Sequence, residues 1–173
     1  SDKNELLMTL GGDVTSAVVP SLEPTEFYHF VVSAVKDGTE VKITTDRYYL
    51  YAAPHEITAK QEDEGVQLRW FCDGHSNDYQ VYRKTNPDAE WVKIADVKAT
   101  TRSYYDKSVE DGTVYYYAVK SGNVDEGKFS AYSESVKFAY ILPTEVTKVT
   151  TSKTSIKIQW KESSVADYYQ IYR

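Results

Sequence analysis

Cys72 and His75 are the residues whose types and spacing come nearest to a nucleophile with its base. They stand three positions apart in a polar segment between two predicted strands, 66–71 and 78–84. Nucleophilic catalysis also needs a group that orients the base and donors that hold an oxyanion. The neighbouring sequence supplies neither. We therefore predict that the chain is not an enzyme and that Cys72 is a buried or half-buried thiol.

The side chains that could bind a metal are not grouped in this sequence. Its three histidines are scattered, without a Cys cluster or a His-x-His pair. Acidic turns at 62–65, 110–112 and 125–127 partly resemble calcium loops, but they lack the alternating oxygens and the distal bidentate Glu of a dedicated site. We expect solvated turns, with no metal and no cofactor.

Outward-facing tyrosines are the better candidates for contact with a ligand. Tyr82 and Tyr116 lie on strands whose alternate residues are expected in the core, which turns both rings outward together with Gln80 and Ala118. Two tyrosine rings on one sheet face can stack on a sugar ring or pack against a protein. Cross-strand tyrosine pairs also simply stabilise a sheet. Both interpretations of the pair stand.

Composition disfavours several kinds of partner. The chain has 173 residues, 16 of them Tyr, and no apolar run of the roughly 18 residues that span a membrane. A net charge of −6 without a Lys/Arg stripe disfavours nucleic acid and anionic membrane surfaces. Cys72 is the single cysteine, so no disulfide can form within one chain. Abundant Tyr, Val, Ile and Thr favour strands, and we predict an all-β fold.

The elements that must position these residues occur twice. Trp70 and Tyr79 mark the first copy of a strand pair in which apolar and polar residues alternate. Trp160 and Tyr169 mark the second copy, 90 positions further on. Alternation of this kind buries one face of each strand, so each copy forms part of a β-sandwich wall.

A turn followed by a long alternating strand is a second repeated element. Segment 22–34 contains Tyr28, and segment 109–119 contains Tyr115 at the equivalent place, 87 positions later. Thr25 stands in the first turn where Gly112 stands in the second.

The repeats divide the chain into three sections. Residues 54–141 hold both elements and are predicted to form a complete domain of seven short strands. Residues 1–53 hold the counterparts of its last four strands, and residues 142–173 hold the counterparts of its first three. Pro54 and Pro143 open the second and third sections. The joints before these prolines are very short, so the sections should lie end to end with limited swing.

Together these motifs resemble tandem fibronectin type III domains. The resemblance rests on the second-strand Trp, the third-strand Tyr-x-Val/Ile and the Tyr after the turn, and it covers essentially the whole chain. It implies immunoglobulin-like sandwiches, with one complete domain flanked by two complementary half-domains, and a tyrosine corner whose hydroxyl bonds backward to the backbone. The core residues that it implies are Trp70, Tyr79, Val81 and Tyr115 in the complete domain, and Tyr28, Trp160 and Tyr169 in the half-domains.

The two half-domains together supply one set of strands, apart from the counterpart of loop 84–87. Each half alone exposes an apolar face and strand edges. We therefore expect residues 142–173 of one chain to complete residues 1–53 of another copy. Reciprocal exchange gives a closed dimer, and head-to-tail pairing gives an open row. Cleavage of a longer array after Arg173 is the alternative origin of such a chain.

The sequence is similar in style to repeats of surface or secreted proteins of Gram-positive bacteria. That resemblance implies an extracellular, non-catalytic spacer of a multidomain surface protein or carbohydrate-active enzyme. The alternative is a module that binds a glycan or a cell-surface protein through its outward tyrosines.

Overall fold

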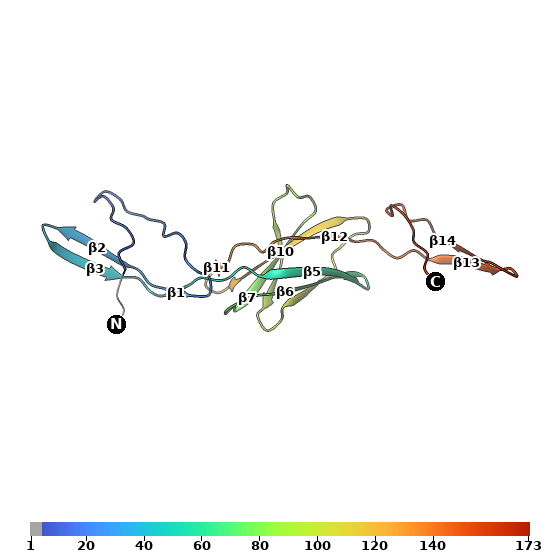
Figure 1. Ribbon diagram of the computed structural model, residues 1–173, viewed down its shortest axis with the longest axis horizontal. Coiled ribbons are helices and arrows are strands. Elements are labelled where there is room, and N and C mark those ends of the chain that lie inside the picture. The colour runs from blue at the N-terminus through green and yellow to red at the C-terminus, as the bar shows by residue number, and fades with distance from the viewer. Residues whose placement is uncertain (1–4) are drawn as a thin grey trace.

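The computed structural model describes residues 5–173, and its regular elements are all strands, which confirms the all-β prediction. Three sections follow one another along the long axis of the molecule (Figure 1). We call them the N-terminal section (residues 5–53), the central domain (54–141) and the C-terminal section (142–173). Residues 1–4 of the first predicted section lie outside the described residues.

The central domain is a sandwich of two antiparallel sheets. The smaller sheet has the order β5-β6-β9, and the larger has the order β11-β10-β7-β8, with β12 also paired to β10. This layout agrees with the fibronectin type III sandwich that the sequence implies. The smaller sheet comprises β5 (His55–Glu62), β6 (Gly65–Phe71) and β9 (Ser103–Asp106). The larger comprises β7 (Asp78–Lys84), β8 (Val92–Lys98), β10 (Val114–Asn123), β11 (Lys128–Phe129) and β12 (Val136–Ala139).

The core of the central domain comes from the inward residues of these strands. Trp70 meets Tyr79 edge-on, with ring centroids 5.3 Å apart. Burial of each such side chain contributes about 1.5–3 kcal/mol to folding. The buried core comprises Val66, Leu68, Trp70, Cys72, Tyr79, Val81, Tyr115, Tyr117, Val119 and Tyr140.

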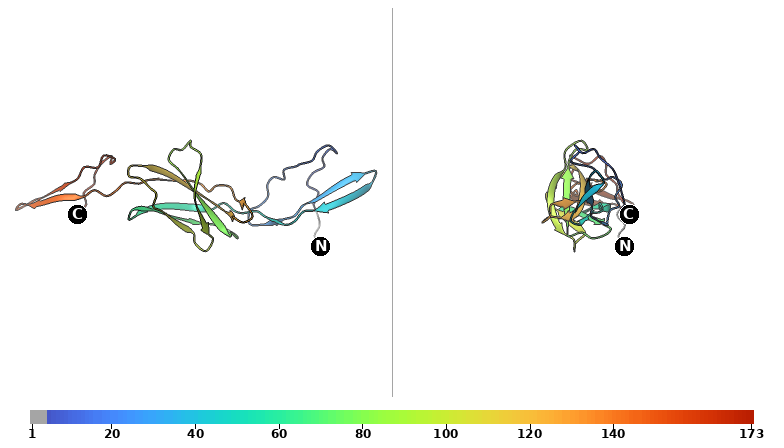
Figure 2. Two further views of the ribbon diagram at one scale, coloured as in Figure 1. Left: turned by 180° about the vertical axis from the view of Figure 1, so that it is seen from behind. Right: turned by 90° about the vertical axis from the view of Figure 1, so that its left-hand side faces the viewer.

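The end sections are built of two-stranded sheets. In the N-terminal section β2 pairs with β3 and β1 pairs with β4, and in the C-terminal section β13 pairs with β14. Seen from behind and from one end, both sections extend away from the central domain along its axis (Figure 2). Their strands are β1 (Phe27–Tyr28), β2 (Val31–Lys36), β3 (Thr39–Thr44), β4 (Tyr48–Tyr49), β13 (Val146–Thr151) and β14 (Ile156–Trp160).

Two features that the resemblance implies for complete domains are not formed in the end sections of the single chain. Tyr28 and Trp160 are half-buried and Tyr169 is exposed, although all three were expected in a core. The strand expected at 168–173 is not formed either. The reason is the same for both. The counterpart of that strand, β7, pairs with β8 and β10, whose own counterparts lie in the N-terminal section at the other end of the molecule.

The turn before the long strand has the same geometry in both copies. The Tyr115 hydroxyl accepts a hydrogen bond from the Glu110 backbone N–H at 2.9 Å, and the Tyr28 hydroxyl accepts one from Glu23 at 2.9 Å. Thr25 adopts φ 71°, close to the 76° of its counterpart Gly112. A left-handed conformation strains a β-branched residue. The turn therefore keeps the glycine geometry without the glycine.

Candidate interaction surfaces

Three aromatic rings gather on the outer face of the larger central sheet. Tyr82 on β7 meets Tyr132 edge-on at 4.9 Å between centroids. Trp91, which lies just before β8, stacks on Tyr132. Their ring centroids are 5.6 Å apart and the angle between the ring planes is 28°. Tyr132 comes from the segment between β11 and β12. We call Tyr82, Trp91 and Tyr132 the aromatic cluster.

Two lysines lie over the rings of the aromatic cluster. The Lys84 Nζ lies 4.6 Å from the Trp91 ring centre, and the Lys120 Nζ lies 4.1 Å from that of Tyr132. The lysines thus occupy ring faces on which a sugar would have to stack. The Tyr82 hydroxyl donates to the Gln80 side chain at 2.7 Å. This arrangement favours stabilisation of the sheet over ligand binding.

The residues that were expected to face outward differ in how much of each side chain is exposed. Tyr82 lies opposite Ala118, and Tyr116 lies opposite Lys84 in the β7–β10 register. Both tyrosines are half-buried, whereas Gln80 and Ala118 are buried and not exposed as predicted. Ala118 has a small side chain and lies opposite Tyr82 on the same face of the sheet. The ring that meets Tyr82 is that of Tyr132, and neither Tyr132 nor Trp91 was predicted from the sequence.

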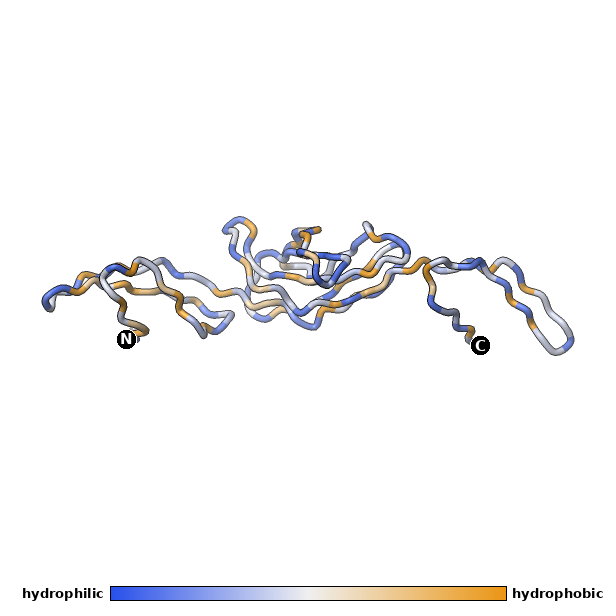
Figure 3. The backbone as a smooth tube through the Cα atoms, turned by 90° about the horizontal axis from the view of Figure 1, so that it is seen from above, coloured by the Kyte–Doolittle hydropathy of each residue, from blue (hydrophilic) through white to orange (hydrophobic). Residues whose placement is uncertain are grey.

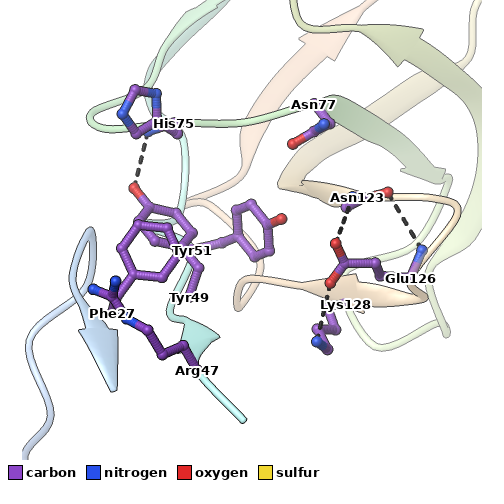
Figure 4. A pocket seen from close by; sticks show the side chains of 9 residues that line it. All are labelled: Phe27, Arg47, Tyr49, Tyr51, His75, Asn77, Asn123, Glu126 and Lys128. Atoms are coloured by element: carbon purple, nitrogen blue, oxygen red, sulfur yellow. Dashed lines mark hydrogen bonds and ion pairs between the residues drawn. The ribbon is translucent and has the colours of Figure 1, made fainter. Parts of the chain in front are cut away.

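A small pocket lies where the N-terminal section meets the central domain (Figure 4). Its volume is about 250 Å³. Tyr49 packs against Tyr51 at 5.0 Å, and its hydroxyl accepts a hydrogen bond from the His75 backbone N–H at 2.9 Å. The pocket is therefore part of the joint between two sections. Its lining comprises Phe27, Arg47, Tyr49, Tyr51, His75, Asn77, Asn123, Glu126 and Lys128.

The two joints of the chain use equivalent segments. At the first, a Cβ on Gly74 would lie 2.6 Å from the Thr25 Cγ2, and at the second, a Cβ on Gly112 would lie 2.5 Å from the Val165 Cγ1. Thr25 and Gly112 are counterparts in the turn before the long strand. Gly74 and Val165 both lie in the segment after the Trp-bearing strand. Each joint therefore packs a β-branched side chain against a glycine.

Cys72 and His75 do not share an environment that would support catalysis. Cys72 is buried, and its thiol donates to the backbone carbonyls of Ala52 and Asp73. Burial raises the pKa of the Cys72 thiol, which disfavours the reactive thiolate. His75 is exposed. Among the described residues, no group of three or more His, Cys, Asp or Glu side chains could hold a metal ion.

Asp106 is a deeply buried carboxylate of the central domain, and it forms an ion pair with Arg83. The Arg83 Nη1 donates to its Oδ2 at 2.7 Å, and the Tyr117 hydroxyl donates to the same oxygen at 3.0 Å. The backbone and hydroxyl of Ser108 donate to its Oδ1. Burial alone would raise the pKa of Asp106, but these bonds from Ser108 and Arg83 lower it below its usual value. The cluster is structural, because both carboxylate oxygens of Asp106 accept hydrogen bonds from groups within the fold.

Both end sections present apolar side chains to solvent. Orange apolar segments alternate along the strands at both ends of the molecule (Figure 3). We call these the two open faces. Their exposed apolar residues include Leu10, Val18, Val32, Val41 and Ile43 in the N-terminal section and Val149, Ile156, Ile158 and Ile171 in the C-terminal section. Patches of this kind on a protein surface mark interaction sites.

Within residues 5–173, no helix is long and apolar enough to cross a bilayer.

No family model and no curated relative matches the chain. Solved structures that it resembles include an Fn3-like protein from Clostridium thermocellum, 27% identical with a TM-score of 0.45, which covers 50% of this chain and 90% of that one. The pectate lyase Pel3 from Pectobacterium carotovorum is 19% identical with a TM-score of 0.44 and covers 56% of this chain and 31% of its own. A human collagen XX FN3 domain is 16% identical with a TM-score of 0.42, and the match covers 51% of this chain and 90% of that one.

Proposed function

We propose that this chain is a non-catalytic extracellular spacer of a multidomain surface protein or carbohydrate-active enzyme. The observation that carries the proposal is the pair of equivalent joints, which holds three sections in one line (Figure 1). A spacer needs a fixed distance between its ends, and close contact at each joint supplies it.

The contacts at the joints support a limited swing between sections. The Leu142 N–H of the C-terminal section donates to the Asp111 carboxylate of the central domain at 2.8 Å. The Gln61 side chain donates at 2.8 Å to the carbonyl of Ile141, the last residue of the central domain. At the other joint, the Lys128 Nζ of the central domain lies 4.8 Å from the Tyr48 ring centre. Short connections with several such contacts resist bending better than flexible linkers do.

A distance measurement between two sections tests the spacer role. Spin labels on cysteines introduced at Asp88 and Ser164, both exposed, report the separation across the second joint. The background carries Cys72→Ala, and labelled chain is diluted with unlabelled chain so that only distances within one chain count. A narrow distance distribution is expected. A distribution as broad as that of a flexible linker contradicts the spacer role.

The alternative function is binding of a glycan or a protein through Tyr82 and Tyr116. A glycan array probed with the native chain and with the Tyr82→Ala/Tyr116→Ala variant separates the two functions. Binding that the double variant loses supports the alternative. The lysines over the aromatic cluster lead us to expect no glycan signal from either protein.

A further inference from the structure

We propose that Asp37 is the chain's preferred site of spontaneous isoaspartate formation, a covalent change of the backbone. The sequence contains three Asp-Gly pairs, at 37–38, 73–74 and 111–112. In such a pair the glycine has no side chain to hinder attack of its backbone nitrogen on the preceding aspartate side chain. The three pairs share this local chemistry, so the fold decides which of them reacts first.

The reaction closes a succinimide ring and reopens it. The Gly38 nitrogen attacks the Asp37 Cγ, and the new N–Cγ bond replaces a Cγ–O bond. The departing oxygen leaves as water, with the N–H proton and the carboxyl proton. Water then opens the ring. Cleavage of the N–Cγ bond restores aspartate, whereas cleavage at the backbone carbonyl carbon leaves the main chain running through Cγ, with no oxidant or reductant involved.

The Asp37-Gly38 pair is free to react. It forms the exposed turn of the β2–β3 hairpin, between the paired residues Lys36 and Thr39, at the outer tip of the N-terminal section (Figure 1). Within residues 5–173, neither the Gly38 N–H nor the Asp37 carboxylate takes part in a hydrogen bond. Nothing lies within 4 Å of a Cβ placed on Gly38. The nitrogen, the carboxyl group and the space for the ring are all available.

The Asp111-Gly112 pair is held by hydrogen bonds at both reacting groups. The Gly112 N–H donates to the Tyr140 carbonyl at 2.9 Å, and the Asp111 Oδ1 accepts from the Leu142 N–H at 2.8 Å. Both bonds must break before the nitrogen can reach the Asp111 Cγ. A Cβ on Gly112 would also lie 2.5 Å from the Val165 Cγ1, so the backbone has little room to turn. This pair should be the slowest.

The Asp73-Gly74 pair is intermediate. Among the described residues no hydrogen bond holds the Gly74 N–H. Its backbone nevertheless packs into the first joint, because a Cβ on Gly74 would lie 2.5 Å from the Tyr49 hydroxyl and 2.6 Å from the Thr25 Cγ2. The Asp73 Oδ2 lies 3.5 Å from the His55 Nε2. Close packing therefore restricts the movement that ring closure needs, although the nitrogen itself is free.

Isomerisation at Asp37 should weaken the hairpin that contains it. Asp37 and Gly38 have φ values of 50° and 78°, the left-handed geometry of a tight type I′ turn. Isoaspartate adds one carbon to the main chain between Lys36 and Gly38, and this turn geometry has no place for it. A two-stranded sheet is only marginally stable by itself. The β2–β3 pairing should therefore open more readily in the modified chain.

Peptide mapping of the full folded chain tests the inference. Samples incubated at neutral pH are digested with trypsin, which places the three pairs on separate peptides. Isoaspartyl peptides keep the mass of their aspartyl forms but elute separately, and a zero-time sample corrects for product formed during digestion. The isoaspartyl form should accumulate first at Asp37, then at Asp73 and last at Asp111. Equal rates at the three sites, or a faster reaction at Asp111, overturn the inference.

The same chain in urea is the matched control for the role of the fold. Unfolding removes the contacts of all three pairs, so their rates should become similar, with the largest increase at Asp111. A ranking that unfolding leaves unchanged shows that sequence alone sets the rates and overturns the structural argument.

Gly38→Asn tests the attacking group. Asparagine tolerates a positive φ, but its side chain stands beside the reacting nitrogen. The variant should lose most of the isoaspartate at Asp37 and keep the native rates at Asp73 and Asp111. Undiminished product at Asp37 overturns the assignment.

Hydrogen exchange of the chromatographically isolated isoaspartyl chain tests the consequence for the hairpin. Amides of β2 and β3 should exchange faster than in the native chain. Those of β13 and β14, a two-stranded sheet in the other end section, should be unchanged. Native exchange rates in β2 and β3 overturn the predicted weakening.

Discussion

The central domain and the C-terminal section are built from the same strand pattern and differ in what covers it. The ring centroids of Trp160 and Tyr169 lie 5.3 Å apart, and those of Trp70 and Tyr79 lie at the same distance. Each section also has a register shift in its first strand pair. Local sequence therefore sets the hairpin and its aromatic contact in both places. Burial is set by the second sheet, which only the central domain contains within one chain.

The strongest test of this comparison truncates the side chain at one equivalent position to alanine in each section. Leu68→Ala should lower the free energy of unfolding of the central domain by about 3–4 kcal/mol, because it leaves a cavity at a fully buried position. Ile158→Ala at the counterpart position should leave that unfolding free energy unchanged. Urea denaturation followed by tryptophan fluorescence measures both. An equal loss from the two substitutions would contradict the independence of the sections.

The second test of the comparison uses the buried ion pair between Arg83 and Asp106. Asp106→Asn should lower the unfolding free energy of the central domain by about 3 kcal/mol, because it leaves the Arg83 guanidinium without its charged partner. Val19 holds the counterpart position in the N-terminal section, so no equivalent loss exists there. Ser108→Ala, which removes one hydroxyl donor, is the milder control and should cost about 1 kcal/mol.

The same carboxylate gives the central domain an acid-dependent stability. Its folded pKa is lowered, so its contribution is fully present above the unfolded value of about 3.9 and is lost as the pH falls through the folded value. The difference in unfolding free energy between native chain and Asp106→Asn should be constant from pH 5 upward on this account and shrink below about pH 4. A difference that grew on acidification would contradict this assignment.

The joints allow a smaller and more local test. Gly112→Thr should cost the central domain about 1–2 kcal/mol through its positive φ. It should also broaden the distance distribution between labels at Asp88 and Ser164, because its Cβ meets Val165. Gly127→Thr is matched in φ but has nothing within 4 Å of its Cβ. It should show a similar loss of stability without the broadening.

The aromatic cluster should give the smallest effect. Lys120→Met removes a cation over the Tyr132 ring and should cost about 0.5–1 kcal/mol. The change keeps the length of the side chain. Thermal unfolding of the central domain measures it. A loss several times larger would mean that Lys120 supports the outer face in a further way.

Much of the fold could be predicted from the sequence because its signals are local. The alternation around Trp70 and Tyr79 predicts strands, and these lie close to β6 and β7 as observed. The members of the aromatic cluster could not be predicted, because Trp91 and Tyr132 reach Tyr82 from segments that no local pattern relates. For Tyr169, repetition predicts what the side chain can pack against, but not whether that surface is present in the same chain.

The short joints have a mechanical consequence. Pro54 leads directly into β5, and the chain leaves the central domain after β12, at the other end of the sandwich (Figure 1). Tension between the two end sections would therefore pull β5 and β12 in opposite directions along their length. Such a pull shears the paired strands, so the ladder bonds between β5 and β6 would share the force instead of opening one at a time.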